Sequence, residues 1–588
     1  MLNPRIYRAA LLPAMLAVVV LAFSFQNEPG PLGTTLAPAA FNAPAAFTDL
    51  SHLARAFPER RPGGRRGDDA LAARIAATLR GPSIGFDVRT ETYQAHTALG
   101  TRPLETVIGE RAGFSSGRIV VIAHRDALGP RATADLSGTA TLIELARVLA
   151  GRTLDRTVDL VSISGSTGLA GATQLANTLG GPIDAVIVLG DVAGTRVTEP
   201  VVVPWSSGEN IAPLLLRNTA AAAIRGETGL APGGADLAAQ FARLAFPMTL
   251  SEQGPFDARG IPAVLLSRAG ERGPSASTPV GKQELNNFGR AALQTISALE
   301  TGPSIPAPSA YLIFKGMAVP EWPIRLLVLA LILPVLAAAV DGFARAKRRG
   351  HTVGRWAGWV LASALPFALA SLLLLGLGVT GLIRVLPPGP VGAGAVHVYL
   401  REAAEIGAAV LLLVLSMFPL RSFIVRRIGV RGDPSDAGGA AAVLLVMCAI
   451  SLAIWATNPF AAALIVPALH LWMWVVAPEV RLRIPVAITL LLVGLAPVAL
   501  VILYYANQFG LGPLGVAWTG VLLIANGGLG VPALLEWSVV AGCAVSVAVI
   551  AARAARADAP EAARVTVRGP ITYAGPGSLG GTKSALRR

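Results

Sequence analysis

Charged residues and cysteine are both scarce in this chain of 588 residues. Only 14% of the residues are Asp, Glu, Lys or Arg, whereas soluble globular proteins have about 25%, so a wholly water-soluble chain is excluded. The two cysteines, Cys448 and Cys543, lie in apolar runs, which excludes a disulfide-framed scaffold. A hydrophobic fraction of 53% excludes disorder. The composition therefore predicts a membrane protein with room for a sizeable water-soluble domain.

The formal net charge of +14 could indicate a nucleic-acid partner, but the placement of the basic residues argues against one. They gather beside long apolar runs, as at 345–349, 421–431 and 481–483. This distribution is typical of the positive-inside rule, and no basic stripe is interleaved with aromatic residues. We therefore predict the lipid bilayer as a partner and no nucleic acid.

The N-terminal segment, residues 1–26, is predicted to be a transmembrane anchor or signal anchor. Its apolar run at 9–25 follows Arg5 and Arg8 and has about the minimum length for spanning. A cleaved signal peptide is the alternative, because the apolar core is short. Either interpretation places the chain that follows outside the cytoplasm, beginning with a linker at 27–49 that is rich in Pro, Gly, Ala and Thr.

Composition divides the rest of the chain into four parts. Residues 50–300 combine mixed charge with short β-rich runs and are predicted to form an extracytoplasmic domain. A linker follows at 301–322, and residues 323–552 are almost continuously apolar. The last part, 553–588, is a basic tail. We therefore predict a multi-pass protein of the cell membrane.

About seven spanning helices are predicted in the apolar part. They lie at 323–341, 356–379, 404–420, 438–457, 460–477, 484–505 and 531–551. A shorter apolar run at 513–528 leaves two topologies open, because the basic tail lies outside if this run spans and in the cytoplasm if it is interfacial. The positive-inside rule favours the second topology.

Strand-like and helical runs alternate within residues 50–300. The strand-like runs are 118–123, 157–163 and 185–190, and helical patterns at 137–151 and 168–179 lie between them. This alternation predicts an α/β domain with a mostly parallel sheet and flanking helices, joined to an all-α multi-spanning membrane domain. In such sheets, ligands bind beyond the carboxyl ends of the strands.

Polar residues stand where that rule expects a site. His124 and Asp126 follow the first strand, Asp191 follows the third, and Asp135 precedes the first helix. One imidazole and two carboxylates can therefore converge at one rim of the sheet. His and Asp suit zinc, and Asp126 is predicted to orient the His124 ring.

Five stretches resemble the two-zinc exopeptidases of peptidase family M28. They are VVIAHRDA, ATADLSGTATLIELARVLA, STGLAGA, VLGDVAG and SEQGPFDARGIPAVLLS, within residues 50–300. The resemblance implies the zinc-exopeptidase fold. It also implies that His124, Asp135 and Asp191 hold one zinc ion, with Asp135 as the residue that bridges to a second metal in the family.

The chain departs from the family where the family carries its catalysis. Gly165 and Ser166 stand in place of a Glu–Glu pair, whose first Glu is the general base and whose second binds the other metal. Ser277 stands in place of a late His ligand. Glycine cannot accept a proton, and losing a general base costs about 10²–10⁴-fold in rate. We therefore assign no catalytic residue and expect a single zinc ion at most.

The leading interpretation is a catalytically degenerate protein that acts as a binding or scaffolding module for a peptide or membrane-protein partner. One alternative is an active membrane-bound metallo-exopeptidase of the aminopeptidase type that uses one zinc ion. A second is a transporter or lipid-handling protein with a peptidase-like lid, for which His470 and Glu536 are the candidate residues.

Other polar features are interpreted as structural. Glu252 lies near the expected substrate rim and could replace the missing base, but we expect it to be a solvated loop residue. The basic stretch 60–66 is likewise expected to be a solvated loop. The segment 164–168 does not match the nucleophile elbow G-x-S-x-G, so serine hydrolysis is not expected.

Overall fold

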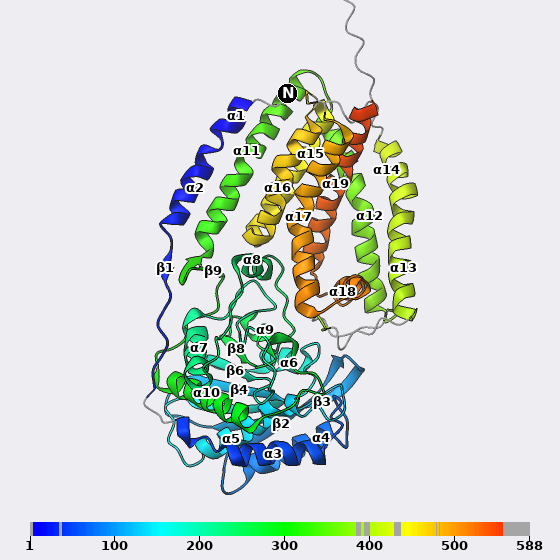
Figure 1. The fold of residues 1–588 in the computed structure, drawn as a ribbon. Helices are drawn as coiled ribbons and strands as arrows, with labels where there is room; N and C mark the ends of the chain where they lie inside the picture. Colours follow the sequence, from blue (N-terminus) through cyan, green and yellow to red (C-terminus); the bar gives the residue numbers. More distant parts are fainter. Residues whose placement is uncertain are drawn as a thin grey trace, which may run out of the picture.

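The computed structural model describes residues 4–34, 38–383, 390–392, 400–428, 437–477, 479–480 and 482–556. Residues 38–301 form an α/β domain, and a bundle of long helices is stacked on one side of it (Figure 1). All of the predicted basic tail beyond residue 556 lies outside the described residues.

A seven-stranded mixed sheet forms the centre of the α/β domain, with the strand order β2-β3-β5-β4-β6-β8-β7. The strands are β2 (Asp87–Thr97), β3 (Gly100–Arg111), β4 (Arg118–His124), β5 (Thr157–Ile163), β6 (Ile183–Leu189), β7 (Val202–Val203) and β8 (Ala263–Leu266). The four central strands are parallel neighbours, and β2, β3 and β7 are antiparallel at the two edges. The predicted α/β class is confirmed, and the predicted parallel arrangement holds for the four central strands of a mixed sheet.

Alternating side chains of β4 divide the core between two layers of helices. Ile119 and Val121 face the layer away from the bundle, and Val120 and Ile122 face the layer toward it (Figure 1). The first layer contains α3 (Ala43–Ala56), α4 (Asp68–Arg80), α5 (Ser137–Leu149), α7 (Leu214–Thr228) and α10 (Lys282–Thr301). The second contains α6 (Ala170–Thr178), α8 (Leu237–Ala245) and α9 (Gly254–Asp257). The second layer connects the sheet to the bundle, because bundle residues belong to the same apolar cluster.

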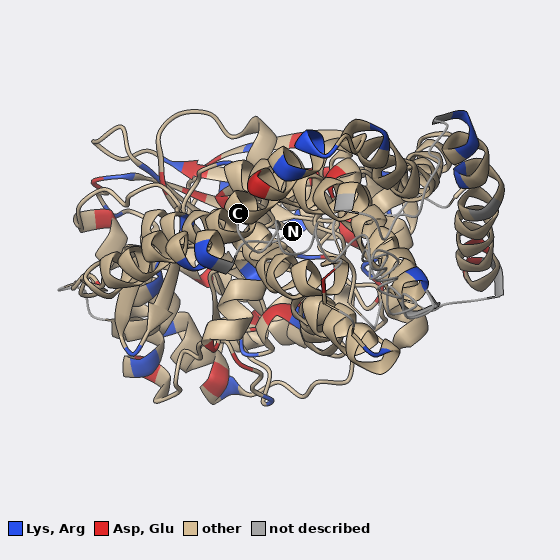
Figure 2. Ribbon diagram, turned by 90° about the horizontal axis from the view of Figure 1, so that it is seen from above, with Lys and Arg blue, Asp and Glu red and all other residues tan. Residues whose placement is uncertain are grey.

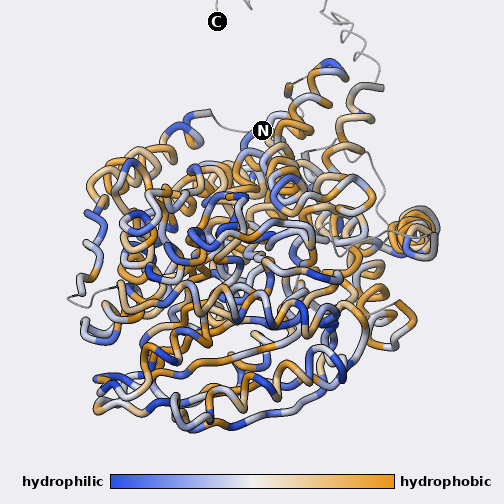
Figure 3. Tube along the Cα trace, turned by 60° about the horizontal axis from the view of Figure 1, so that its bottom comes forward, coloured by the Kyte–Doolittle hydropathy of each residue, from blue (hydrophilic) through white to orange (hydrophobic). Residues whose placement is uncertain are grey.

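The bundle is predominantly apolar, in contrast to the mixed α/β domain (Figure 3). Its helices are α1 (Pro4–Ala9), α2 (Leu12–Ala22), α11 (Glu321–Arg348), α12 (Val353–Val379), α13 (Leu400–Leu415), α14 (Arg421–Ile428), α15 (Ala437–Thr457), α16 (Pro459–Val476), α17 (Ile484–Phe509), α18 (Pro513–Ala525) and α19 (Val531–Arg556). Seven helices of the described chain are long and apolar enough to cross a membrane, namely 5–22 and α11, α12, α15, α16, α17 and α19.

Two apolar segments differ from these seven. The predicted span 404–420 is interrupted by a π-helical turn, Ser416–Leu420, that contains Pro419, so α13 alone has only 16 residues. Proline cannot donate the backbone hydrogen bond that an α-helix needs at this position. The weaker candidate 513–528 forms α18, a helix of 13 residues at the end of the bundle near the α/β domain (Figure 1).

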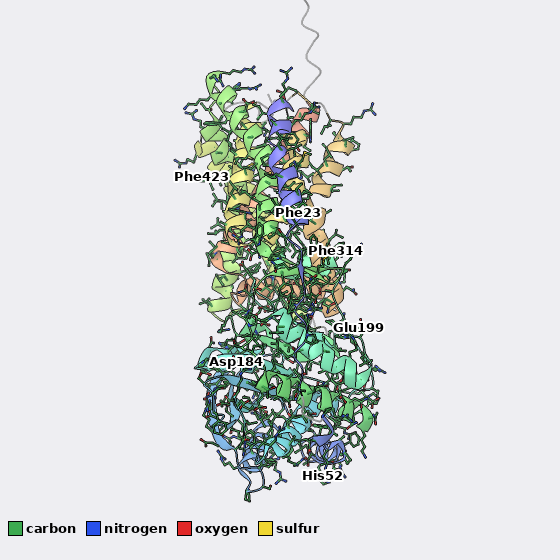
Figure 4. The ribbon with its side chains drawn as sticks, turned by 90° about the vertical axis from the view of Figure 1, so that its left-hand side faces the viewer. Phe23, His52, Asp184, Glu199, Phe314 and Phe423 are labelled. Atoms are coloured by element: carbon green, nitrogen blue, oxygen red, sulfur yellow. The ribbon has the colours of Figure 1, made fainter. Side chains whose placement is uncertain are left out.

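The two predicted linkers come together at the junction of the two parts. Strand β1 (Gln26–Asn27) pairs antiparallel with β10 (Met317–Pro320), which pairs with β9 (Tyr311–Phe314). Both stretches therefore contain regular structure, and α3 already begins inside the predicted linker 27–49. Figure 4 labels Phe314 near this junction, His52 at the far end of the α/β domain and Phe423 toward the opposite end of the bundle.

Candidate functional site

A cavity of about 420 Å³ lies beyond the carboxyl ends of the parallel strands. His124 ends β4, Asp191 follows β6, and both line the cavity, as do the other predicted site residues Asp126, Asp135 and Ser166. The remaining wall includes residues 390–392, which belong to the connection between α12 and α13. The predicted site residues are therefore brought to one cavity, and a segment of the bundle closes part of it.

The His124 ring pairs with Glu252. Its Nδ1 atom lies 3.2 Å from Glu252 Oε2, and only 6% of the Glu252 side chain is exposed. The expectation that Glu252 is a solvated loop residue is therefore wrong. The amide of Leu250 donates to Glu271 and draws the loop inward, which buries Glu252 against the site. The adjacent carboxylates raise the pKa of His124 to about 10 although burial alone lowers it.

Asp126 is hydrogen-bonded to Ser166. Its carboxylate accepts hydrogen bonds from the amide and the hydroxyl of Ser166, at 3.2 and 3.1 Å. The His124 ring contacts Glu252 through Nδ1, so its orientation by Asp126 stays a prediction. Burial raises the pKa of Asp126 to about 7.

Asp191 and Asp135 also line the cavity. Oδ1 of Asp191 accepts from the amides of Gly194 and Ala193, at 2.6 and 3.1 Å. Its Oδ2 atom is buried without a hydrogen-bond partner among the described residues. Burial raises the pKa of Asp135 to about 6 and also raises that of Asp191. Asp126, Asp135, Asp191, Glu252 and Glu271 thus line a cavity that contains a single imidazole, that of His124.

These residues do not fit a three-ligand zinc centre in this conformation. Within the described ranges, no group of three or more His, Cys, Asp or Glu side chains is arranged to hold a metal ion. A zinc ion needs ligands that converge to about 2.0–2.2 Å, whereas Asp191 Oδ1 is turned toward backbone amides. The proposed set of His124, Asp135 and Asp191 therefore stays a prediction.

The loop after β5 is shaped for glycine at position 165. Gly165 has φ +80°, and a Cβ atom there would lie 2.8 Å from Leu104 Cδ1 and 3.2 Å from Ala170 Cβ. A side chain at this position is therefore strained in its backbone and crowded by its neighbours. The carboxylate that the family places here could not be restored without moving the loop.

Gly165→Ala is expected to lower the free energy of unfolding by about 1–3 kcal/mol because it combines this backbone strain with the close contact. Denaturant unfolding of the purified chain measures the change. Gly180→Ala is the matched control, since a Cβ at Gly180 meets nothing within 4 Å. Equal effects of the two substitutions would contradict the account of this loop.

Buried charges behind the cavity fix the loops that form it. Arg125 and Asp68 are both fully buried and form an ion pair at 2.8 Å. Arg60, 1% exposed, donates to the backbone carbonyls of Arg125 and Ala132. These roles are not predicted from the sequence, and the expectation that Arg60 belongs to a solvated loop is wrong. One feature of the sequence does indicate a buried ion pair here, because Arg125 is a charged residue directly after an apolar strand.

A second buried pair joins the cavity wall to the bundle. Arg243 of α8 contacts Glu271, with 1% and 0% of the side chains exposed. The Arg243 guanidinium also donates to the Tyr504 hydroxyl at 2.8 Å and lies 5.4 Å from the centre of the Tyr505 ring. Both tyrosines belong to α17, and Glu271 lines the cavity. The end of a bundle helix is thus attached to a wall of the site.

His470 and Glu536, the two candidate residues of the bundle, lie within the bundle helices α16 and α19. His470 Nδ1 lies 2.7 Å from the Tyr7 hydroxyl, and Nε2 lies 2.9 Å from the Leu331 carbonyl. The ring therefore links α1, α11 and α16, which is a structural role. Glu536 lies near the start of α19, at the end close to the α/β domain (Figure 1).

The sheet order, the two helical layers and the site beyond the strand ends define an α/β domain of the zinc-exopeptidase class. Residues 106–280 match the family model described as Peptidase family M28. The resemblance predicted from the motifs is therefore confirmed for this part of the chain. No curated protein matches the chain.

Several solved structures are similar to the α/β domain. They include a glutaminyl cyclase from an Acidobacteriales bacterium, with 19% identity over 47% of this chain and 99% of that chain and a TM-score of 0.35. A zinc aminopeptidase from Bacillus subtilis has 12% identity over 44% of this chain and 94% of that chain, with a TM-score of 0.34. An aminopeptidase from Aneurinibacillus sp. has 14% identity over 46% of this chain and 95% of that chain, with a TM-score of 0.37.

Proposed function

We propose that this chain is a catalytically degenerate, membrane-embedded relative of the zinc exopeptidases. Its α/β domain binds a peptide segment of a partner close to the bilayer surface and holds it without cleaving it. The observation that carries this proposal is the composition of the loop after β5. Gly165 and Ser166 supply no carboxylate there. Ser166 instead donates hydrogen bonds from its amide and its hydroxyl to the Asp126 carboxylate.

The domain is proposed to lie outside the cytoplasm. Helix α11 leaves the junction and ends in Arg345, Lys347 and Arg348 at the far end of the bundle (Figure 1). Arg426 and Arg427 end α14, and α19 ends at Arg556. Both helix ends lie at the same end of the bundle as the end of α11 (Figure 1). Figure 2 views the molecule from this end, with Lys and Arg in blue. By the positive-inside rule, this end faces the cytoplasm and the α/β domain lies on the other side.

The charge of the cavity favours a ligand with a cationic group. Five carboxylates line it, whereas His124 and Arg272 are its basic residues. The α-ammonium group at the start of a peptide complements this excess of acid. A bound cation also favours the ionised forms of Asp126 and Asp135, whose pKa values are raised by burial.

The wall formed by residues 390–392 places the same cavity next to the bundle. The aromatic end of α17 is fixed to another part of that wall through Arg243 and Glu271. A peptide that enters this cavity therefore passes close to the membrane surface. This position suits a segment of a membrane protein better than a freely soluble polypeptide.

A peptide-binding measurement tests the proposal. The probe is an alanine tripeptide with a free α-amino group and a C-terminal fluorophore, titrated with the full chain in nanodiscs. We expect Asp135→Asn or N-acetylation of the probe to weaken binding about tenfold, the loss expected for one charge-assisted hydrogen bond. Asp155→Asn is the control, because Asp155 is an exposed acid outside the cavity. Equal affinities in all cases would contradict the proposal, and cleavage of the probe would contradict the loss of catalysis.

One observation favours an active metallo-exopeptidase as the second candidate. Glu252 lies in the cavity beside His124, and its Oε1 atom is buried without a partner among the described residues. A carboxylate in this place could accept a proton from water, which is the role that Gly165 cannot fill. Under this alternative, hydrolysis of the same probe requires zinc and is lost in Glu252→Gln.

A further inference from the structure

A second cavity, of about 700 Å³, is lined by four arginines. Arg61, Arg65 and Arg66 come from the segment between α3 and α4, and Arg131 comes from the loop after β4. None of the four forms a salt bridge within the described part of the chain, and Glu59 is the acidic residue that lines the cavity with them. All four arginines are exposed to solvent, and the cavity carries more positive charge than Glu59 can neutralise.

The loop that carries three of these arginines is held at both ends by buried groups. Before it, Arg60 donates to the carbonyls of Arg125 and Ala132. After it, Asp68 pairs with Arg125 and accepts from the amide of Gly63 at 2.9 Å. The backbone is therefore fixed before any ligand binds, which lowers the entropy lost on binding.

The fourth arginine stands at a strained position. Arg131 has φ +56°, a conformation that residues other than glycine rarely adopt, and its amide donates to the Pro58 carbonyl at 2.8 Å. Strain of this kind persists only where surrounding structure maintains it, and it concentrates at ligand sites. Arg131 lines the same cavity as the three arginines of the other segment.

We propose that this cavity binds a phosphoryl-type oxyanion. Guanidinium groups donate in pairs to the oxygens of such anions, and a phosphoryl dianion can bind several of them at once. A single carboxylate would neutralise only one of the four. The segment joins α3 and α4, which lie on the side of the sheet turned away from the bundle (Figure 1), so a soluble phosphate compound reaches it more directly than a lipid headgroup does.

The proposed anion site shares a loop with the acidic cavity. Residues 127–129 and Ala132 line the acidic cavity, whereas Pro130 and Arg131 line the arginine cavity. A ligand in one cavity therefore contacts the backbone that shapes the other. The proposal does not depend on peptide binding, because the arginine cavity has its own residues and its own ligand class.

Titration calorimetry of the full chain in detergent, with inorganic phosphate and pyrophosphate, tests the proposal. We expect saturable binding, with pyrophosphate tighter, and a loss of at least about tenfold in Arg61→Gln/Arg66→Gln, as expected when charge-assisted hydrogen bonds are removed. Arg74→Gln/Arg225→Gln is the charge-matched control, since both residues are exposed and lie outside this cavity. An unchanged melting temperature without ligand shows that the variants fold.

A second set of measurements separates the two sources of the anion. Nanodiscs of phosphatidylcholine are compared with nanodiscs that also contain phosphatidic acid. Pyrophosphate affinity that is equal in both membranes assigns the site to a soluble compound, and affinity reduced by phosphatidic acid assigns it to a headgroup. Binding that is weak, non-saturable or equal in the cavity and control variants would overturn the proposal.

Discussion

Replacing Arg243 by Met is expected to lower the free energy of unfolding by about 3–5 kcal/mol, the usual effect of removing one partner from a buried ion pair. Glu271 would be left as a fully buried carboxylate without its counter-ion. The substitution also removes the hydrogen bond to Tyr504 and the contacts of the guanidinium with the rings of Trp205 and Tyr505. Trp205 belongs to the α/β domain and Tyr505 to the bundle. The substitution therefore weakens the attachment of the bundle to the α/β domain.

Denaturant unfolding of the full chain in detergent measures this effect. The double variant Arg243→Met/Glu271→Gln is expected to recover a large part of the stability, because no unpaired charge then remains buried. Arg225→Gln, an exposed arginine of α7, is the control and should change stability by less than about 0.5 kcal/mol. A loss below about 1 kcal/mol for Arg243→Met would show that this pair does not hold the two parts together.

Arg125→Met is expected to have an effect of similar size, a loss of about 3–5 kcal/mol, because Asp68 would remain buried without its partner. Arg125 also donates to the backbone carbonyls of Ser162 and Glu105, which would lose those hydrogen bonds. The loop after β4 contributes to both cavities, so we also expect weaker binding of ligands in each.

A surface pair of the same charges provides the matched comparison for Arg125. Arg89 lies 3.4 Å from Glu110, but 49% and 30% of their side chains are exposed. Arg89→Met should therefore cost less than about 1 kcal/mol in unfolding free energy. If Arg89→Met and Arg125→Met destabilise the chain equally, burial does not determine the strength of these pairs and the account of the loop fails.

The sequence predicts the central strands well because buried parallel strands are continuous apolar runs. The run 118–123 corresponds to β4, and 157–163 coincides with β5. The antiparallel edge strands β2 and β3 were not predicted, since their half-exposed residues alternate less clearly with polar ones. The junction strand β1 has two residues and becomes regular only by pairing with β10, far along the chain.

The candidate site could be predicted in part for the same reason. His124 and Asp191 follow strand ends, so local sequence places them at one edge of the sheet. Glu252 was misjudged because its burial depends on the contact between Leu250 and Glu271, which the sequence around it does not encode. The attachment of Arg243 to α17 depends in the same way on a segment more than 250 residues away, as its contact with Tyr504 shows.

The loop after β5 has no carboxylate to accept a proton from water, and an assay of hydrolysis by the purified full chain tests the resulting loss of catalysis most directly. The assay follows aminoacyl p-nitroanilide cleavage with added zinc, with and without a chelator, for the unmodified chain and His124→Ala. We predict turnover at the background rate in every case, with less than one zinc ion retained per chain. Chelator-sensitive turnover that disappears in His124→Ala would contradict the account.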